Sequence, residues 1–159
     1  MTYINQLETL CQQCGCKMET EVSLAEHTTF RVGGSCRALV HVNSARTVQT
    51  LVQFLRREEI PFAVLGRGSN VIVPDEGFDG VVLLFGHAFA RITRQKNQLV
   101  CQGGASLRAI CTAALDAGLT GLEFAYGIPG TVGGGLYMNA GAYGGELSHV
   151  AVSAEYLDR

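Results

Sequence analysis

The chain has 159 residues, of which 47% are hydrophobic and 16% charged, and its formal net charge is −2 at neutral pH. This length suits one domain or a pair of small ones, and such an apolar composition excludes a disordered chain. The slightly acidic balance argues against a nucleic-acid-binding protein, which needs a basic face. The apolar runs are strand-sized and no signal-peptide pattern opens the sequence, so we expect a cytoplasmic protein without a membrane span.

Apolar residues at helical spacing predict three helices, each with one apolar face. The first covers residues 3–16 and is expected to end near Gly15. Ser44 is a suitable N-cap for the second helix, and Ser106 for the third. Gly118 is well placed to end the third helix, because glycine readily adopts the left-handed conformation that follows a helix C-terminus.

Short apolar or alternating runs predict strands, separated by turns rich in glycine and proline. The predicted strands are residues 37–42, 62–65, 71–73, 81–85 and 150–157, with a hairpin formed by 90–94 and 98–102. Run 81–85 is apolar on both faces and is therefore expected to be central in its sheet. Residues 22–26 alternate only weakly, and the paired glycines 33–34 predict a tight turn. Short strands outnumber helices and alternate with them irregularly, which predicts an α+β fold with two small sub-domains that share a cleft.

Two glycine-rich stretches carry the functional interpretation. Residues 124–145 contain eight glycines and no charged residue, and a shorter turn spans Gly66–Asn70. Glycine is used this densely where the backbone turns tightly or approaches another molecule, and successive exposed amides form a cradle for phosphate. Either loop alone is also compatible with an ordinary tight turn. Both together in one short chain predict a bound dinucleotide, for which FAD is the leading candidate.

The sequence lacks the common nucleotide and metal motifs. In Gly66–Val71 a valine replaces the third glycine of the dinucleotide fingerprint and no helix follows, and no Gly-Lys pair exists for a Walker A loop. Three of the six cysteines, Cys11, Cys14 and Cys16, are close together, but no second CxxC follows at zinc spacing. The favoured interpretation is small buried cysteines in a reducing compartment, and no metal is expected.

Five linked motifs resemble the UDP-N-acetylenolpyruvoylglucosamine reductase (MurB) family, in its branch with the shorter C-terminal part. The motifs are His-Thr-Thr-Phe-Arg-Val-Gly-Gly at 27–34, Leu-Gly-Arg-Gly-Ser-Asn-Val-Ile-Val at 65–73, Gly-Leu-Glu-Phe at 121–124, Gly-Ile-Pro-Gly-Thr-Val-Gly-Gly at 127–134 and Met-Asn-Ala-Gly-Ala-Tyr-Gly-Gly-Glu at 138–146. The resemblance implies an FAD-binding domain of the vanillyl-alcohol-oxidase (PCMH) type, in which two α+β sub-domains clasp the cofactor. It also implies NADPH-dependent reduction of an enolpyruvyl ether to UDP-N-acetylmuramate, a cytoplasmic step of peptidoglycan precursor synthesis.

The resemblance divides the chain into an N-terminal helix (1–20) and two FAD-binding sub-domains (21–88 and 89–159). It implies that Gly66–Asn70 meets the pyrophosphate, that Gly127–Gly134 runs along the pyrophosphate and ribityl chain, and that Asn139–Gly141 lies under the isoalloxazine. The implied cofactor-binding residues are Gly66, Arg67, Gly68, Ser69, Asn70, Val71, Ala125, Gly127, Pro129, Gly130, Thr131, Gly133, Gly134, Asn139, Ala140 and Gly141.

Two residues depart from the family pattern, in which a small or neutral polar residue is expected at position 67 and a small residue at position 126. Arg67 either pairs with a phosphate or lies exposed, and Tyr126 either shields the flavin or packs. Glu123 and Glu146 flank the glycine stretch, and we expect solvated or capping carboxylates there rather than a catalytic pair.

The family's catalytic arginine, serine and glutamate, and its domain for the UDP-sugar substrate, are expected beyond Arg159. No catalytic residue is therefore expected in this chain, and the chain alone is expected not to turn over. Two alternatives remain open at this point. One is the FAD-binding half of another flavoprotein oxidoreductase of the same fold, and the other is a non-catalytic flavin-binding module. The sequence makes no prediction of the oligomeric state.

Overall fold

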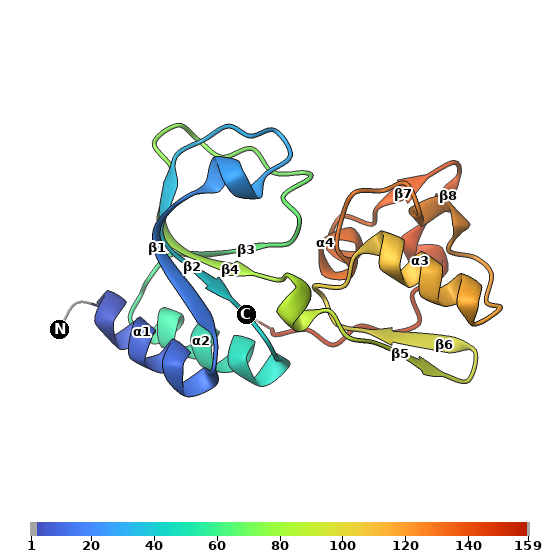
Figure 1. Cartoon of the computed structure of the whole chain (residues 1–159), viewed down its shortest axis with the longest axis horizontal. Helices are drawn as coiled ribbons and strands as arrows, with labels where there is room; N and C mark the ends of the chain where they lie inside the picture. Colours follow the sequence, from blue (N-terminus) through green and yellow to red (C-terminus); the bar gives the residue numbers. More distant parts are fainter. Residues whose placement is uncertain (1–2, 159) are drawn as a thin grey trace. The chain divides into compact units, whose positions relative to one another are not determined.

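The computed structural model describes residues 3–158, and its internal contacts divide the chain into two units, Met1–Ala88 and Phe89–Arg159. Arg159 and the first two residues of the predicted N-terminal segment lie outside the described residues. Each unit has a hydrophobic core of its own and contains one of the two glycine-rich stretches. Figure 1 shows the elements of both units along the chain.

The first unit is built on a four-stranded sheet with the order β1-β2-β4-β3. Strands β1 and β2 pair antiparallel, and both β2 and β3 run parallel to β4. Helices α1 and α2 lie side by side along this sheet (Figure 1). The elements in chain order are α1 (Tyr3–Cys14), β1 (Lys17–Ser23), the 3-10 helix η1 (Leu24–His27), β2 (Ser35–His41), α2 (Ala45–Arg57), β3 (Phe62–Leu65) and β4 (Phe78–Leu84).

Strand β4 is central, as predicted from its apolar run, and its residues Val81, Val82 and Leu83 are all buried. Successive residues of a strand point to opposite faces, so burial of all three means that both faces of the sheet are covered. Val82 belongs to the core cluster on one face, together with Leu39 and Leu65.

Both helices of the first unit begin or end as their sequences predict. The Ser44 hydroxyl accepts a hydrogen bond from the Thr47 amide at 3.1 Å and so caps α2. Helix α1 ends at Cys14, and Gly15, which follows it, has a φ of +65°. The Gly15 amide donates to the Gln12 carbonyl, and the Cys16 amide donates to the Cys11 carbonyl at 2.8 Å. This pattern is the Schellman motif, which uses glycine because a left-handed residue without a Cβ is unstrained.

Two expectations for the first unit were wrong, and one strand was missed. Residues 71–73 form no strand: they belong to the connection between β3 and β4, which must cross back because the two strands are parallel. The paired glycines 33–34 pack against that connection rather than forming an isolated turn, since a Cβ on Gly33 would lie 2.5 Å from the Val73 Cβ. Strand β1 was not predicted, because its alternating pattern is weak and none of its seven residues is fully buried.

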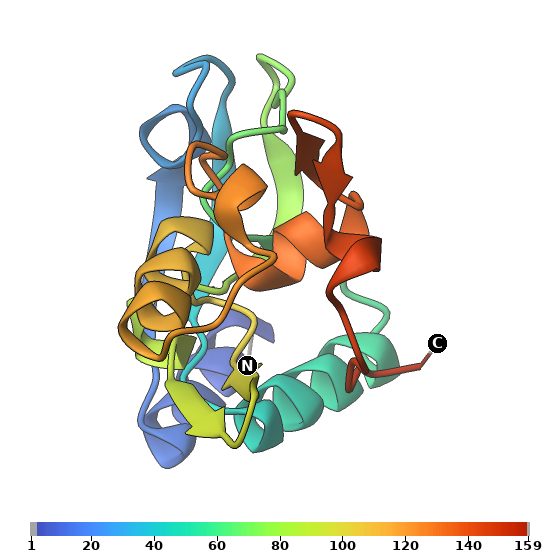
Figure 2. The ribbon, with the colours of Figure 1, turned by 90° about the vertical axis from the view of Figure 1, so that its right-hand side faces the viewer.

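The second unit combines a hairpin, two helices and short turns around one core. Its elements are β5 (Ile92–Gln95), β6 (Gln98–Cys101), α3 (Leu107–Asp116), the 3-10 helix η3 (Glu123–Ala125), α4 (Val132–Tyr137), β7 (Gly141–Ala142), β8 (Gly145–Glu146) and the 3-10 helix η4 (Leu147–His149). The core is formed by Leu107 and Ile110 of α3 with Ala125 and Leu147, and α3, α4 and the β7–β8 pair lie around it (Figure 2).

The hairpin and α3 confirm the sequence predictions for the second unit. Ile92 of β5 lies opposite Cys101 of β6 in an antiparallel pair. The Ser106 hydroxyl accepts a hydrogen bond from the Ala109 amide at 3.1 Å, and Gly118 follows the helix with a φ of +66°.

The C-terminal strand predicted over residues 150–157 is wrong. The Val150 amide donates to the Leu147 carbonyl as the end of η4, and Val152 and Tyr156 are exposed without a partner strand among the described residues. An alternating pattern makes a strand only where another strand can complete its hydrogen bonds. Helix α4 was not predicted either, because three of its six residues are glycine.

Candidate functional site

The turn that follows β3 presents a run of free backbone donors. Among residues 3–158, the amides of Arg67, Gly68, Ser69 and Asn70 donate to no carbonyl and no side chain. Backbone amides in folded proteins are nearly always paired, so four successive free donors are unusual. Consecutive N–H groups of this kind form a concave anion-binding nest. The turn is therefore suited to receive a group with several acceptor oxygens.

The fold itself explains why one of these residues is glycine. Gly68 has a φ of +62°, and a Cβ on it would lie 2.1 Å from the His27 carbonyl oxygen. The Thr29 amide donates to the Gly68 carbonyl at 3.0 Å, so segment 27–29 supports the turn from behind. Within this support, Thr28 is only 6% exposed and its hydroxyl has no hydrogen-bond partner among the described residues.

Arg67 projects from the same turn with an exposed side chain. Its guanidinium makes no ion pair and no hydrogen bond within residues 3–158. Ser69 is half-buried, whereas Asn70 and Val71 are exposed. The turn thus carries one unpaired positive charge beside its free amides, a combination that favours an anionic partner.

In the second unit, the glycine loop that precedes α4 is fastened to the start of α3. The Leu107 amide donates to the Gly130 carbonyl at 3.0 Å, and the Val132 amide donates to the Ala105 carbonyl at 2.7 Å. Ala125, at the entry to the loop, is completely buried, whereas Pro129 at its tip is exposed. The loop is therefore held at both ends while its middle remains accessible.

Several of the predicted contact residues in this loop serve the fold. Thr131 is 3% exposed, and its hydroxyl accepts a hydrogen bond from the Gly134 amide at 3.3 Å as the N-cap of α4. The Gly133 amide donates to the Gly103 carbonyl at 2.9 Å. The amides of Gly133 and Gly134 are thus already engaged. The amides of Gly127 and Gly130 remain free, since they donate to no carbonyl among the described residues.

Within this loop, packing of the chain does not explain the glycine at position 127. It has no positive φ, and a Cβ placed on it would meet no atom within 4 Å. An alanine would therefore fit the chain by itself. A glycine here leaves room for a molecule that is not part of the chain to approach the backbone. This position of the loop is therefore open to a ligand that approaches the backbone closely.

The corner at Asn139, Ala140 and Gly141 follows α4, and hydrogen bonds to the segment around β8 hold its backbone. Asn139 has a φ of +45°, which is unusual for a residue other than glycine. Gly141 pairs with Glu146 in the β7–β8 ladder, and a Cβ on it would lie 2.7 Å from the Gly145 carbonyl oxygen.

Tyr126 stands directly before Gly127 and its side chain is 50% exposed. The guanidinium of Arg108 lies over its ring, 5.1 Å from the ring centre. A cation over an aromatic face is an attractive contact, so this ring is held by the start of α3 rather than left free to swing. The Arg108 contact was not predicted from the sequence, since no local pattern links the two residues.

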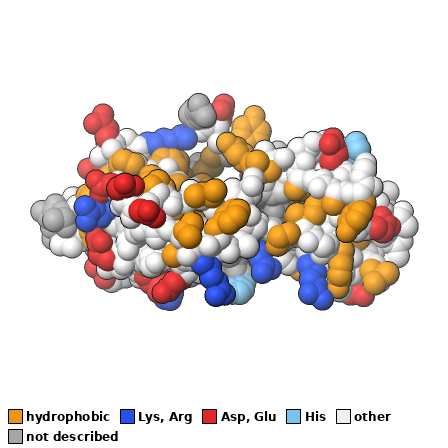
Figure 3. Space-filling view, turned by 90° about the horizontal axis from the view of Figure 1, so that it is seen from above, with side chains coloured by type: hydrophobic (Ala, Val, Ile, Leu, Met, Phe, Trp, Pro, Cys, Tyr) orange, Lys and Arg blue, Asp and Glu red, His pale blue; other side chains and the backbone are white. Residues whose placement is uncertain are grey.

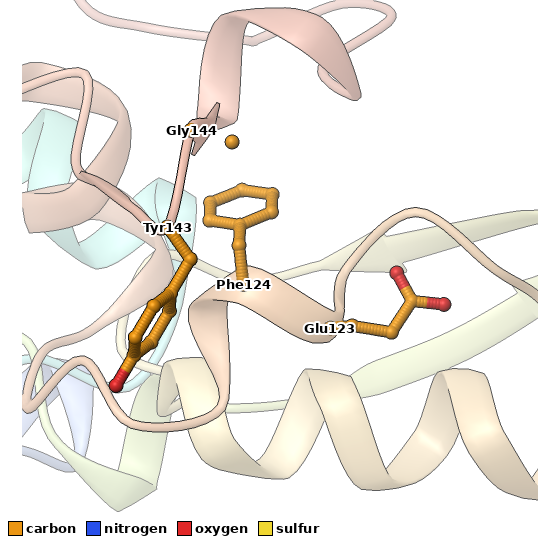
Figure 4. A pocket seen from close by; sticks show the side chains of 5 residues that line it. Glu123, Phe124, Tyr143 and Gly144 are labelled. Atoms are coloured by element: carbon orange, nitrogen blue, oxygen red, sulfur yellow. The ribbon is translucent and has the colours of Figure 1, made fainter.

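A hollow of about 460 Å³ lies beside the β7–β8 turn, but its polar groups do not converge (Figure 4). The side chains of Glu123, Phe124 and Tyr143 point in three different directions. The Glu123 carboxylate accepts a hydrogen bond from the Gly121 amide at 2.8 Å and so closes its own turn. Tyr143 is 98% exposed. We assign no chemistry to this hollow.

The cysteines do not form a site either. All six are free thiols, and no group of His, Cys, Asp and Glu within residues 3–158 could hold a metal ion. Burial raises the pKa of the Cys11 thiol to about 12, so it remains protonated at neutral pH. The part of the chain that the structure describes contains no helix of the length and hydrophobicity that crossing a bilayer requires.

The chain is similar in sequence and in fold to known proteins. Residues 36–159 match the family model described as FAD binding domain. The UDP-N-acetylenolpyruvoylglucosamine reductase of Clostridium botulinum (strain Eklund 17B) is 43% identical over 141 residues, which cover 89% of this chain and 46% of that enzyme. The crystal structure of the same reductase (MurB) from Thermus caldophilus superposes with a TM-score of 0.63 at 36% identity, covering 82% of this chain and 44% of that one.

A more distant neighbour, alkyldihydroxyacetonephosphate synthase, has a TM-score of 0.67 at 19% identity, covering 94% of this chain and 35% of that one, and this likeness bears on the fold alone. The fold and the two glycine loops define an FAD-binding domain of the vanillyl-alcohol-oxidase type. The chain belongs to the FAD binding domain family, with FAD as its cofactor. Its relatives by sequence are UDP-N-acetylenolpyruvoylglucosamine reductases, and it spans about half the length of those curated relatives.

Proposed function

We propose that this chain is the FAD-binding portion of a UDP-N-acetylenolpyruvoylglucosamine reductase. The assignment implies a cytoplasmic protein of peptidoglycan precursor synthesis that acts on neither nucleic acid nor membrane. The complete enzyme would use NADPH to reduce the enolpyruvyl ether of its UDP-sugar substrate, and that substrate would bind only with a further C-terminal domain. The observation that carries the proposal is the run of free amides at Arg67–Asn70, in a chain that shares 43% identity with such a reductase.

In this proposal the residues of the chain bind and orient the cofactor. The free amides of Arg67–Asn70 donate to the diphosphate oxygens, with added hydrogen bonds from Ser69 and Asn70. Arg67 adds a positive charge. Gly66 and Val71 flank this turn as further contacts.

The loop of the second unit would meet the diphosphate and ribityl chain through its accessible backbone. Gly127, Pro129 and Gly130 supply this contact, since their surface is not used by the core. Ala125, Thr131, Gly133 and Gly134 give the loop its shape and line it. Asn139, Ala140 and Gly141 would lie against the isoalloxazine, where small residues allow close approach. FAD, once bound, supplies the hydride-transfer chemistry of the reaction.

A matched pair of glycine variants tests the assignment. Gly127→Ala adds a methyl group where no atom of the chain lies within 4 Å, so its free energy of unfolding should equal that of the wild type. Gly86→Ala is the control, because Gly86 also lacks a positive φ and has only the Leu84 Cγ at 4.0 Å. FAD affinity, measured by quenching of flavin fluorescence, should fall about tenfold or more in Gly127→Ala, a loss of roughly 1.4 kcal/mol, and stay unchanged in Gly86→Ala.

The wild-type chain should bind FAD and acquire the yellow absorption of a bound flavin. A purified chain that neither carries nor takes up FAD contradicts the proposal at once. We expect the 159-residue chain alone not to oxidise NADPH in response to the enolpyruvyl substrate, because the reductases it resembles are about twice as long. Substrate-dependent turnover at an enzymatic rate would show that the chain needs no further domain.

A further inference from the structure

Hydrogen bonds join Asn139, Ser148 and Glu146 into a small network at the corner that follows α4. The Asn139 Oδ1 atom accepts a hydrogen bond from the Ser148 amide at 2.9 Å. The Ser148 hydroxyl donates to the Glu146 Oε1 atom at 2.5 Å. Ser148 therefore links Asn139 to Glu146, through its amide on one side and its hydroxyl on the other.

The backbone around this network is fixed at both ends. The Ala140 amide donates to the Gly135 carbonyl of α4 at 2.8 Å, and the Leu147 amide donates to the Ala140 carbonyl at 3.1 Å. Leu147 is 4% exposed and anchors the segment in the core. Between these fixed points, the backbone conformation depends on the left-handed turn at Asn139, whose φ is +45°. A residue with a Cβ holds this conformation only when its surroundings impose it.

We propose that Glu146 and Ser148 are positioning residues for the flavin: by holding Asn139 in its left-handed conformation, they fix the orientation of the Ala140–Gly141 backbone against which the cofactor binds. This inference rests on the proposed function. In this inference the Asn139 side chain has a structural use, because its Oδ1 atom accepts the hydrogen bond from the Ser148 amide. Asn139 would then serve the cofactor through its backbone.

The exposure of the network separates this role from general stability. Asn139 and Ser148 are exposed, and the Glu146 side chain is 42% exposed. Polar contacts at exposed positions contribute little to the free energy of unfolding, because water replaces them when they break. Loss of the network should therefore disturb the local backbone, and with it cofactor binding, more than the fold.

The decisive variants are Ser148→Ala, Ser148→Thr and Asn139→Gly. Ser153→Ala is the matched control, because Ser153 is exposed and forms no hydrogen bond among the described residues. Ser148→Ala removes the donor to Glu146, whereas Ser148→Thr keeps it. Asn139→Gly favours the left-handed conformation but removes the acceptor of the Ser148 amide. FAD affinity should fall about tenfold in Ser148→Ala and in Asn139→Gly, the scale of one hydrogen bond to a charged group. Ser148→Thr and Ser153→Ala should bind as the wild type does.

A second measurement needs no cofactor. Hydrogen exchange of the residue-148 amide, followed by NMR in the cofactor-free chain, should be slow in the wild type and in Ser148→Thr, and at least about tenfold faster in Asn139→Gly, because the acceptor is gone. Equal FAD affinity and an unchanged flavin spectrum in wild type, Ser148→Ala and Asn139→Gly would overturn the inference and leave the proposed function standing. A wild-type chain that binds no FAD would overturn both.

Discussion

Thr28 carries a buried hydroxyl that has no hydrogen-bond partner among the described residues. Replacing Thr28 with valine, which has nearly the same shape, should leave the free energy of unfolding unchanged or raise it by about 1 kcal/mol, because an unsatisfied buried polar group costs about 1–3 kcal/mol. Thr47→Val is the matched control: Thr47 is 5% exposed, but its hydroxyl donates to the Asn43 Oδ1 atom at 2.7 Å. This control should lose about 1–2 kcal/mol.

Urea unfolding of the cofactor-free chain measures both changes. If Thr28→Val is destabilised as much as Thr47→Val, the Thr28 hydroxyl has a partner in solution. If Thr28→Val keeps its stability but binds FAD more weakly, the hydroxyl serves the neighbouring Gly66–Asn70 turn when FAD is bound.

Glu146 offers a second test at the level of a single residue. The hydrogen bond from Ser148, then that from Asn139, lower the pKa of its carboxyl below the ordinary value of 4.5, and His149 faces it at 3.6 Å. Because the folded-state pKa is lowered, the contribution of this carboxylate is present above the unfolded pKa and is lost as the pH falls through the folded one. NMR titration of the Glu146 side chain should give a pKa below 4.5 in the wild type and a value closer to 4.5 in Ser148→Ala. An identical titration in both proteins would mean that Ser148 does not donate to the carboxylate.

Helix α4 depends on one glycine whose neighbours leave it no room. A Cβ on Gly135 would lie 2.8 Å from the Leu147 Cδ1 atom and 3.3 Å from Leu107, both of which are buried in the core. Gly135→Ala should therefore lower the free energy of unfolding by about 1–3 kcal/mol, the usual cost of overpacking. Gly134→Ala, in the same helix, would meet only the Thr131 hydroxyl at 3.3 Å, and alanine's higher helix propensity offsets that contact. Urea midpoints of the two variants should differ clearly, and equal midpoints would show that the core around Leu147 can relax.

The elements that the sequence predicts well are those whose signals are local. Capping serines at 44 and 106, the glycine after α3 and the 90–102 hairpin all carry their signal within a few residues. The failures depend on distant partners. Residues 150–157 alternate like a strand but pair with no strand of the described chain, and α4 forms in a glycine-rich segment because Thr131 caps it and Leu147 packs on it.

For the candidate site too, local features could be predicted from the sequence and contacts between distant residues could not. The glycine-rich turns were visible in the sequence, and the structure shows that Gly68 and Gly133 are needed by the protein's own backbone and packing. Only the coordinates distinguish them from Gly127, around which space is open. Thr28, Arg108 and Ser148 were not predicted, because their relevance comes from contacts with residues distant in sequence or from a missing partner.

At the scale of the whole molecule, each unit exposes apolar side chains, which are shown in orange in Figure 3. Tyr137, Met138 and Tyr143 are among those exposed on the second unit, and Phe30 and Ile72 on the first. Exposed apolar surface of this kind is typical of proteins that bind a ligand or a further domain.

Cofactor binding should therefore stabilise the chain as a whole, and by an amount that depends on the diphosphate. A ligand that binds only the folded state adds about 2.7 kcal/mol at a concentration 100 times its dissociation constant. FAD at that concentration should raise the Tm of the wild type by several degrees, whereas riboflavin at the same concentration should raise it little, because it lacks the diphosphate that the free amides of Arg67–Asn70 would bind. Differential scanning fluorimetry of the wild type, with Gly127→Ala as the weakened variant and Gly86→Ala as the control, makes the comparison. A riboflavin shift as large as that of FAD would mean that the chain recognises the flavin ring and that the nest at Arg67–Asn70 contributes nothing to binding.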